Sequence, residues 1–389
     1  MAKTDTQCKY YKKCGGCQLQ NMTYPEQLAY KQRMVNSLLS KYGRVNKIIG
    51  MENPYHYRNK VQAAFGWDYK RKRCISGVYQ SNSHRIVAVD SCMIEDQKAD
   101  EIIVSVRKLA DAFKIKPYDE DRNVGFLRHV LVKRGFSTNE IMVVIVSSNP
   151  VFPSRNHFVK ALLKQHPQIT TIVHNINPFQ TNLVLGQQNK ILYGKGYIED
   201  ILCGCVFRIS PSSFYQINPV QTEVLYRTAI DYAKLTGKET LFDSYCGTGT
   251  IGIIAAKSAK QVLGVELNRD AVKDAISNAK RNQIKNIYFE CGDAGKFLTE
   301  ITKAKEKFNV VMMDPPRAGS SIEFLKSVTT MKPDRIVYIS CNPVTLARDL
   351  GYITTHGYRA EKIQPVDMFP FTRHVETVVL LSRKVISHP

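Results

Sequence analysis

A cysteine stands where an apolar run breaks into a turn, in the stretch "VYISCNP" from Val337 to Pro343. Cys341 follows residues typical of a buried strand, and Asn342-Pro343 then ends the strand pattern. A thiol there has three interpretations: core packing, metal ligation, or nucleophilic attack on a substrate. The rest of the chain has to distinguish between them.

A glycine-rich turn lies about 90 residues earlier, in "FDSYCGTGTIG" from Phe242 to Gly252. The glycines let the backbone approach a ligand closely, and the following helix start offers free N–H groups to an anion. The next strand ends in Glu266, whose carboxylate can accept both hydroxyls of a ribose. Asp293 follows the third strand and can meet an adenine amino group. This combination fits NAD or S-adenosylmethionine.

The fourth strand of this region ends in "NVVMMDPPRAG", which places Asp314 and Arg317 at its tip. Open α/β sheets bind ligands outside the carboxyl ends of their strands, so this tip should face the same crevice as the glycine-rich turn. The alternative interpretation is that Pro315 and Pro316 only terminate the strand.

A second group of cysteines lies in "CKYYKKCGGC" and, far along the chain, in "VAVDSCMIED". Four thiolates can hold zinc or a 4Fe-4S cluster, and the spacing leaves both open. The four residues are Cys8, Cys14, Cys17 and Cys92. Cys203 and Cys205 form a competing pair, which we interpret as packing residues that share one face of a strand.

The charge of the chain limits its partners. Lysine and arginine total 55 against 34 acidic residues, a net charge of +21, which predicts salt-dependent attraction to polyanions. A solubilising surface charge is the alternative. We find no signal peptide and no apolar stretch long enough to span a bilayer, so we expect a cytoplasmic protein without membrane contact. We also expect a monomer. Ten cysteines in a reducing compartment are then not a disulfide framework.

The pattern of elements changes along the chain. An amphipathic helix is expected within residues 21–43, followed by a basic, aromatic β segment and a mixed region with a hairpin at 129–148. After Asn218-Pro219, strands and helices alternate as in a doubly wound parallel sheet, with strands predicted at "ETLFDSY", "VLGVEL", "IYFECGD", "NVVMMD", "RIVYIS" and "ETVVLLSRK". We predict three segments: residues 1–95, 96–208 and 209–389.

Four motifs carry a resemblance to a known family: "DSYCGTGTIG", "DPPRAG", "SCNPVTLARDL" and "TRHVETVVLL", with "SFYQINP" and "CGGC" before them. In this order they resemble the RNA uridine C5-methyltransferases, which make 5-methyluridine with S-adenosylmethionine. The resemblance covers nearly the whole chain. It implies an α/β protein with a C-terminal Rossmann-like class I methyltransferase domain and an N-terminal and central α+β domain that carries an iron-sulfur cluster.

The resemblance also implies roles for individual residues. Uracil C5 is a poor nucleophile, and addition of a thiolate to C6 makes it an enolate with negative charge at C5. Cys341 is implied as that nucleophile and Glu376 as the base that removes the C5 proton. Cys246 in the glycine-rich turn is the rival nucleophile. The implied cofactor residues are Gln216, Tyr245, Gly247, Gly249, Glu266, Asp293 and Asp314; Phe214 and Arg317 are implied to contact the substrate base.

The family resemblance further favours a 4Fe-4S cluster on Cys8, Cys14, Cys17 and Cys92. Members with this cluster mostly modify 23S ribosomal RNA, so that RNA is favoured over tRNA. The β-barrel RNA-binding module that many members carry before the cluster is expected to be missing. Amino-group methylation, cytosine C5 methylation and a non-catalytic RNA-binding role are the alternatives. The first needs neither Cys341 nor Glu376, and in the second the cysteine normally follows the fourth strand.

Overall fold

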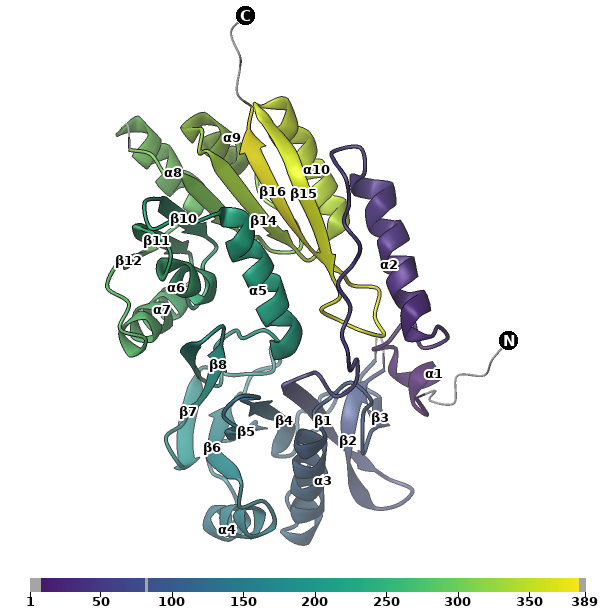
Figure 1. The fold of residues 1–389 in the computed structure, drawn as a ribbon. Coiled ribbons are helices and arrows are strands. Elements are labelled where there is room, and N and C mark those ends of the chain that lie inside the picture. Colours follow the sequence, from purple (N-terminus) through teal and green to yellow (C-terminus); the bar gives the residue numbers. More distant parts are fainter. Residues whose placement is uncertain (1–7, 81–82, 305, 385–389) are drawn as a thin grey trace, which may run out of the picture. The chain divides into compact units, whose positions relative to one another are not determined.

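The computed structural model describes residues 8–80, 83–304 and 306–384 (Figure 1). The chain divides into two compact units, and each unit consists of three stretches that are not consecutive in the sequence. Unit 1 contains residues 1–21, 53–201 and 208–219, and unit 2 contains residues 22–52, 202–207 and 220–389. The sequence analysis predicts three consecutive segments, with boundaries at residues 95/96 and 208/209. This division into three segments stays a prediction. No helix in the described part of the chain is long and apolar enough to cross a membrane.

Unit 1 is built on a seven-stranded sheet in the order β3-β2-β1-β4-β5-β6-β7. Neighbouring strands are antiparallel except for the parallel pair β5 and β6. The helices α3 and α4 pack on one face of this sheet, over alternate residues such as Val61 and Ala63. The elements are α1 (Tyr11–Cys14), β1 (Lys60–Asp68), β2 (Arg73–Tyr79), β3 (Ile86–Ala88), α3 (Gln97–Ala112), β4 (Leu127–Arg134), β5 (Ile141–Ser147), α4 (Arg155–Gln165), β6 (Ile169–Ile176) and β7 (Gln188–Tyr193).

The central hairpin of unit 1 confirms the predicted one. All seven residues of β5 are buried, because α3 and α4 cover one face and a second apolar cluster covers the other. Such a continuous apolar strand is typical of a sheet covered on both sides. A two-stranded sheet of β8 (Ile198–Leu202) and β9 (Cys205–Ile209) follows. Cys203 lies in the turn between them with φ near 50°, so the interpretation of Cys203 and Cys205 as neighbours on one strand is wrong.

Unit 2 contains a second seven-stranded sheet, in the order β12-β11-β10-β13-β14-β16-β15. The strands are parallel except for β16, which runs antiparallel to both of its neighbours. Helices α8, α9, α10 and α2 share a core on one face (Figure 1). The elements are α2 (Tyr24–Leu39), α5 (Pro219–Ala233), β10 (Thr240–Ser244), α6 (Thr250–Ala256), β11 (Gln261–Glu266), α7 (Arg269–Arg281), β12 (Ile287–Cys291), α8 (Ala294–Lys303), β13 (Val310–Met313), α9 (Ile322–Met331), β14 (Arg335–Ser340), α10 (Pro343–Thr355), β15 (Tyr358–Val366) and β16 (Glu376–Arg383).

The edge strand β15 is absent from the sequence prediction, which assigns no element to residues 358–366. Its sequence "YRAEKIQPV" contains Pro365 and charged residues, which weaken a strand signal. Edge strands tolerate both, because one side of their backbone is not paired within the sheet. Here the segment after α2 covers that side, through isolated parallel bridges from Val45 to Ile363 and from Ile49 to Val366.

Helix α2 belongs to unit 2 although it follows the N-terminal cysteines in the sequence. It starts with a capping box at Thr23 and Glu26 and packs beside α10 and β15 (Figure 1). Its Lys31 is fully buried and pairs with the fully buried Asp367 at 2.5 Å. Tyr24 also donates a hydrogen bond to Asp367, at 3.0 Å. Moving α2 away would leave the Asp367 carboxylate buried without its cation, which is costly. The pair therefore holds α2 in one position.

We therefore expect Lys31→Met to lower the free energy of unfolding by about 3–5 kcal/mol, because it leaves the Asp367 carboxylate buried without its cation. Denaturant unfolding followed by circular dichroism measures this loss. The exposed pair of Lys273 and Asp270 supplies the matched control, and Lys273→Met should leave the unfolding midpoint unchanged. An equal midpoint for Lys31→Met and wild type would show that the pair contributes nothing.

Candidate active site

The register of β14 and β16 brings the two predicted catalytic residues together. Ser340 pairs with Thr377 at the end of the antiparallel ladder, so Cys341 and Glu376 lie at the adjoining positions of neighbouring strands. Strand β13 runs parallel to β14 and ends at Met313, so Asp314 follows it at the same edge of the sheet. Three chemically active side chains therefore meet at the carboxyl edge of the sheet in unit 2.

Burial and charge define the acid-base state of this group. Glu376 is 5% exposed, and burial together with the nearby Asp314 carboxylate raises its pKa to about 8, with Arg317 acting in the opposite direction. Burial raises the pKa of Asp314 to about 7. Burial also raises the pKa of the Cys341 thiol to about 11; the two carboxylates add to the shift and Arg317 opposes it. At neutral pH the protein therefore keeps protons on the thiol and on most of Glu376.

This protonation predicts a pH-dependent stability. Because the pKa of Glu376 is higher in the folded protein than the roughly 4.3 of an unfolded chain, its stabilising contribution is present at low pH. That contribution is lost as the pH rises through about 8. Chemical denaturation of wild type and Glu376→Gln should therefore diverge between pH 5 and pH 8, by at most about 1.4 kcal/mol per pH unit. Parallel curves would contradict the raised pKa.

The loop after β13 is tied to helix α10. The Asn342 side chain caps α10 by accepting from the Val344 N–H at 3.1 Å, and its Nδ2 donates to the Arg317 carbonyl at 3.1 Å. The Asp349 carboxylate accepts from the Ser320 N–H at 2.9 Å. The turn after Cys341 thus positions both the thiol and the "DPPR" loop. Sequence reasoning assigns Asn342 to the turn but gives Asp349 no role.

Arg317 reaches toward the strand that carries the proposed base. Its guanidinium lies 3.3 Å from Nε2 of His374, two residues before Glu376. Burial lowers the pKa of His374, and the positive charge of Arg317 lowers it further, which keeps the imidazole neutral beside the guanidinium. His374 is a site residue that the sequence analysis missed, although it stands in the quoted motif "TRHVETVVLL".

The glycine-rich turn between β10 and α6 adopts the backbone that its glycines predict. Gly247 and Gly249 have φ of 55° and 77°. A side-chain carbon on Gly249 would come 2.8 Å from the ring of Phe289, whereas one on Gly247 would meet open space. Glu266, at the end of β11, accepts from the Gly247 N–H at 3.1 Å and from the Asn268 N–H at 2.8 Å. The carboxylate is therefore held beside the turn.

Asp243 is a buried carboxyl that the sequence analysis did not single out. Its Oδ2 has no hydrogen-bond partner, and burial raises its pKa to about 8. A side-chain carbon on Gly252 would lie 2.7 Å from that oxygen, so only glycine fits there. Asp243 thus supports the packing of α6 against the sheet, while the Glu266 carboxylate beside the open side of Gly247 fits a cofactor with hydroxyl groups.

The other predicted ligand residues have different surroundings. Asp293 caps α8, since its Oδ1 accepts from the Lys296 N–H at 2.9 Å. Tyr245 has φ near 60°, and its ring packs against that of Phe324 with centroids 5.2 Å apart. Phe214 is 69% exposed. Phe214 and Gln216 belong to unit 1, where the Gln216 carbonyl accepts from Asn59 Nδ2 at 3.0 Å.

The four N-terminal cysteines lie in unit 1 and line one cavity of about 210 Å³. Burial raises the pKa of the Cys17 thiol to about 11, and the pKa values of Cys14 and Cys92 also rise because of burial. Yet within residues 8–80, 83–304 and 306–384, no three His, Cys, Asp or Glu side chains are close enough to hold a metal ion. The structure thus gathers Cys8, Cys14, Cys17 and Cys92 without forming a closed ligand set.

A comparison with solved structures identifies the class of protein. The tRNA (uracil-54, C5)-methyltransferase of Pyrococcus abyssi, solved in complex with S-adenosyl-L-homocysteine, has a TM-score of 0.79 and 28% sequence identity. The match covers 94% of this chain and 85% of that one. Together with the sheet order and the glycine-rich turn, this likeness identifies a class I methyltransferase fold.

Sequence comparisons identify the family. The model of the tRNA (uracil-5-)-methyltransferase family matches residues 23–384. An RNA methyltransferase of Halalkalibacterium halodurans is 43% identical over 98% of this chain and 84% of that protein. An RNA methyltransferase of Clostridium tetani is 42% identical over 98% of this chain and 83% of that protein. The chain therefore belongs to the tRNA (uracil-5-)-methyltransferase family. It is an RNA uracil-C5 methyltransferase that uses S-adenosylmethionine.

Proposed function

We propose that this enzyme makes 5-methyluridine in 23S ribosomal RNA, with Cys341 as the nucleophile and Glu376 as the proton acceptor. The observation that carries the assignment of roles is the end of the β14–β16 ladder, where Cys341 and Glu376 adjoin each other next to Asp314. A nucleophile and a base at one strand edge are the two groups that C5 methylation of uracil requires.

The first half of the reaction belongs to Cys341. The Cys341 thiol first loses its proton to solvent, and the thiolate sulfur then adds to C6 of the uracil. The C5–C6 π electrons move toward O4, and the resulting enolate carries negative charge to C5. The carboxylates of Asp314 and Glu376 oppose thiolate formation, whereas Arg317 favours it. We assign Arg317 to the substrate side, where its charge stabilises both the thiolate and the enolate. S-adenosylmethionine supplies the methyl group when it is bound.

The second half belongs to Glu376. Once C5 carries the methyl group, the carboxylate removes the C5 proton, the electrons of the C–H bond re-form the C5–C6 double bond, and the thiolate of Cys341 leaves C6. A base for this step should have a pKa near the working pH, and burial brings the pKa of Glu376 to about 8. The same burial excludes water from the carbon that loses the proton.

The residues proposed to hold S-adenosylmethionine lie around the glycine-rich turn. Glu266 suits the ribose hydroxyls, since its carboxylate is fixed by two backbone N–H groups. The open side of Gly247 leaves room for the ligand chain. We assign adenine to Asp293. Tyr245, Gly249, Asp314 and Gln216 complete the proposed cofactor set, and Phe214 is assigned to stacking on the extruded uracil.

We further propose that Cys8, Cys14, Cys17 and Cys92 hold a structural 4Fe-4S cluster. They fit the group because all four line one cavity, and thiolates are the ligands that such clusters take. Protein purified without oxygen should be brown and contain about four irons and four sulfides per chain. Cys17→Ser should lose that iron, whereas Cys291→Ser, at an exposed cysteine, should keep it. A colourless protein that contains zinc would contradict the proposal.

The choice of RNA has support on both sides. The cysteine cluster favours 23S ribosomal RNA, because family members that carry it mostly act there. A tRNA uridine is the second candidate, favoured by the 28% identity to the Pyrococcus abyssi enzyme, whose name specifies uracil-54 of tRNA. The net charge of +21 suits either polyanion. We propose that the enzyme acts as a monomer, which light scattering would test.

The deciding experiment incubates the protein with methyl-labelled S-adenosylmethionine and, separately, with transcripts of 23S ribosomal RNA and of tRNA. We expect label in the ribosomal transcript, and mass spectrometry of nuclease digests should place it at C5 of a uridine. Label in tRNA alone would replace the substrate. Label in neither RNA would remove both candidates.

A further inference from the structure

A cavity in unit 1 is lined by residues between positions 62 and 184, which precede the motifs of the active site in the sequence. It has a volume of about 1060 Å³ and opens on the sheet face opposite α3 and α4. We call it the amide pocket and define it by Gln62, Tyr79, Glu120, His129, Gln180 and Asn182. Gln62 and Ala64 point to this face of β1, and Ala64 pairs directly with His129 of β4. Strand register thus determines one wall of the pocket.

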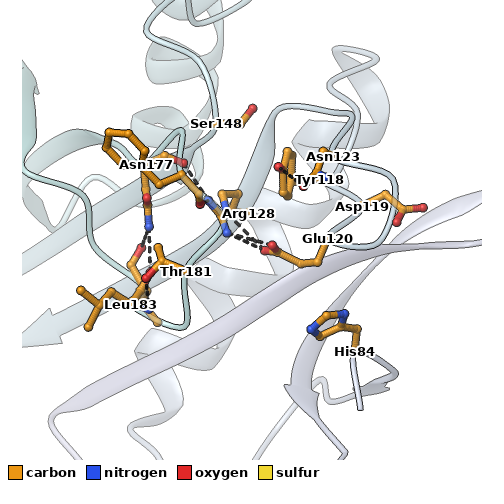
Figure 2. A network of polar contacts seen from close by, with 12 residues as sticks. His84, Tyr118, Asp119, Glu120, Asn123, Arg128, Ser148, Asn177, Thr181 and Leu183 are labelled. Carbon is orange, nitrogen blue, oxygen red and sulfur yellow. Dashed lines mark hydrogen bonds and ion pairs between the residues drawn. The ribbon is translucent and has the colours of Figure 1, made fainter.

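The opposite wall is the loop after β6, and buried polar contacts fix it (Figure 2). The guanidinium of Arg128, a residue 2% exposed, donates to the carbonyls of Asn177 and Phe179 at 2.8 and 2.7 Å. Asn177 in turn donates to the Leu183 carbonyl at 2.8 Å. Because these contacts hold the loop on both sides of Gln180 and Asn182, the pocket is preorganised.

The charge of Arg128 is paired with Glu120 in a bidentate ion pair. Glu120 accepts from Arg128 at 3.0 and 2.8 Å, as Figure 2 shows. The described residues that line the pocket include no lysine or arginine. A phosphate would therefore face a carboxylate without a free cation. The lining instead offers amides and hydroxyls, which recognise uncharged groups.

His129 is a buried polar residue in the lining of the pocket. It is 6% exposed and lines the pocket, and its Nδ1 has no hydrogen-bond partner. Its ring meets the edge of Tyr79 with centroids 6.1 Å apart and an interplanar angle of 82°. Burial and the nearby Arg128 lower the pKa of His129 to about 4, so the imidazole is neutral at pH 7 and offers a hydrogen bond rather than a charge. His129 therefore adds a neutral polar side chain to the wall of the pocket.

We propose that the amide pocket binds one unpaired base of the substrate RNA, distinct from the uracil that is methylated. Glutamine and asparagine side chains match the donor and acceptor groups on base edges, and an aromatic ring such as Tyr79 provides a stacking surface. The base lies against His129, which lines the pocket. The inference extends the proposed function, since it rests on an RNA substrate that presents unpaired nucleotides.

Fluorescence anisotropy tests the pocket directly. The full chain is titrated, without S-adenosylmethionine, into fluorescein-labelled transcripts of 23S ribosomal RNA fragments and of tRNA. The comparison uses the transcript that wild type binds most tightly. Gln62→Ala and His129→Phe should each raise the Kd for this transcript by about 5–10-fold over wild type, as expected for one lost base contact. The matched control is Gln165→Ala, an exposed glutamine at the end of α4, and its Kd should equal that of wild type.

Ultraviolet cross-linking gives a second readout. Irradiated complexes should yield a nucleotide adduct on the peptide that contains Tyr79 or His129. Unchanged Kd values for both pocket variants, or adducts confined to other peptides, would overturn the proposal. Gln62 is exposed, so Gln62→Ala keeps the test valid if His129→Phe does not fold. Binding is measured without methyl transfer, so the two proposals are tested separately. The pocket variants can bind RNA like wild type while methylation persists, and RNA methylation can be absent while the pocket still binds RNA.

Discussion

Cys341→Ala will lower uracil methylation by roughly 10⁴-fold or more while leaving S-adenosylmethionine binding intact. Without the sulfur, no bond forms at C6 and C5 stays a poor nucleophile, so the variant loses the chemical step itself. The proposed cofactor residues Gly247 and Glu266 should be unaffected, since they lie after β10 and at the end of β11 rather than after β14. Single-turnover methylation and calorimetric titration with S-adenosylmethionine measure the two effects separately.

Two other cysteines make this test specific. Cys291→Ala changes an exposed cysteine at the end of β12 and should methylate at the wild-type rate. Cys246→Ala addresses the rival nucleophile, whose burial raises the pKa of its thiol even further than that of Cys341. Loss of activity in Cys246→Ala, with substantial methylation by Cys341→Ala, would reverse the assignment. RNA containing 5-fluorouridine should also trap an adduct on Cys341, because no C5 proton can leave.

Glu376→Gln has the second-largest expected effect, a loss of about 10²–10⁴-fold in turnover. Glutamine has nearly the same shape but cannot accept the C5 proton, so the reaction stops after methyl transfer. The uracil then stays bonded to the sulfur. A covalent complex of protein and methylated RNA should therefore accumulate on denaturing gels, and mass spectrometry should locate it at Cys341.

The matched control for this change is Glu323→Gln, an exposed carboxylate on α9, which should turn over normally and form no adduct. Slow turnover of Glu376→Gln without an adduct would place its role before methyl transfer. Turnover at the wild-type rate would remove Glu376 from the mechanism and leave Asp314 as the candidate base, since it interacts with Cys341 and burial raises its pKa to about 7.

Much of the local structure of unit 2 is readable in the sequence. The sequence predicts that Asn342-Pro343 ends the strand, and in the structure β14 ends at Ser340, Asn342 caps α10 and Pro343 lies in its first turn. The sequence also predicts a glycine-rich turn after the first strand of the parallel sheet, and Gly247 and Gly249 lie there with positive φ. These features depend on residues next to one another, so the types of a few side chains determine them.

Tertiary structure alone decided which distant residues meet. Nothing near Glu376 in the sequence indicates that β16 inserts antiparallel beside β14, yet this register sets the carboxylate next to Cys341. Helix α2 likewise joins unit 2 through Lys31 and Asp367, which lie 336 positions apart.

The amide pocket also depends on tertiary structure, because its walls come from the sheet of unit 1 and from the loop after β6.

By itself, the sequence determined the order of the motifs, most of the strands and the candidate residues, since those depend on short-range periodicity and residue chemistry. Strand order, register and burial depend on contacts between segments far apart in the chain. They therefore emerged only in the folded protein, and they set the pKa values of Cys341 and Glu376.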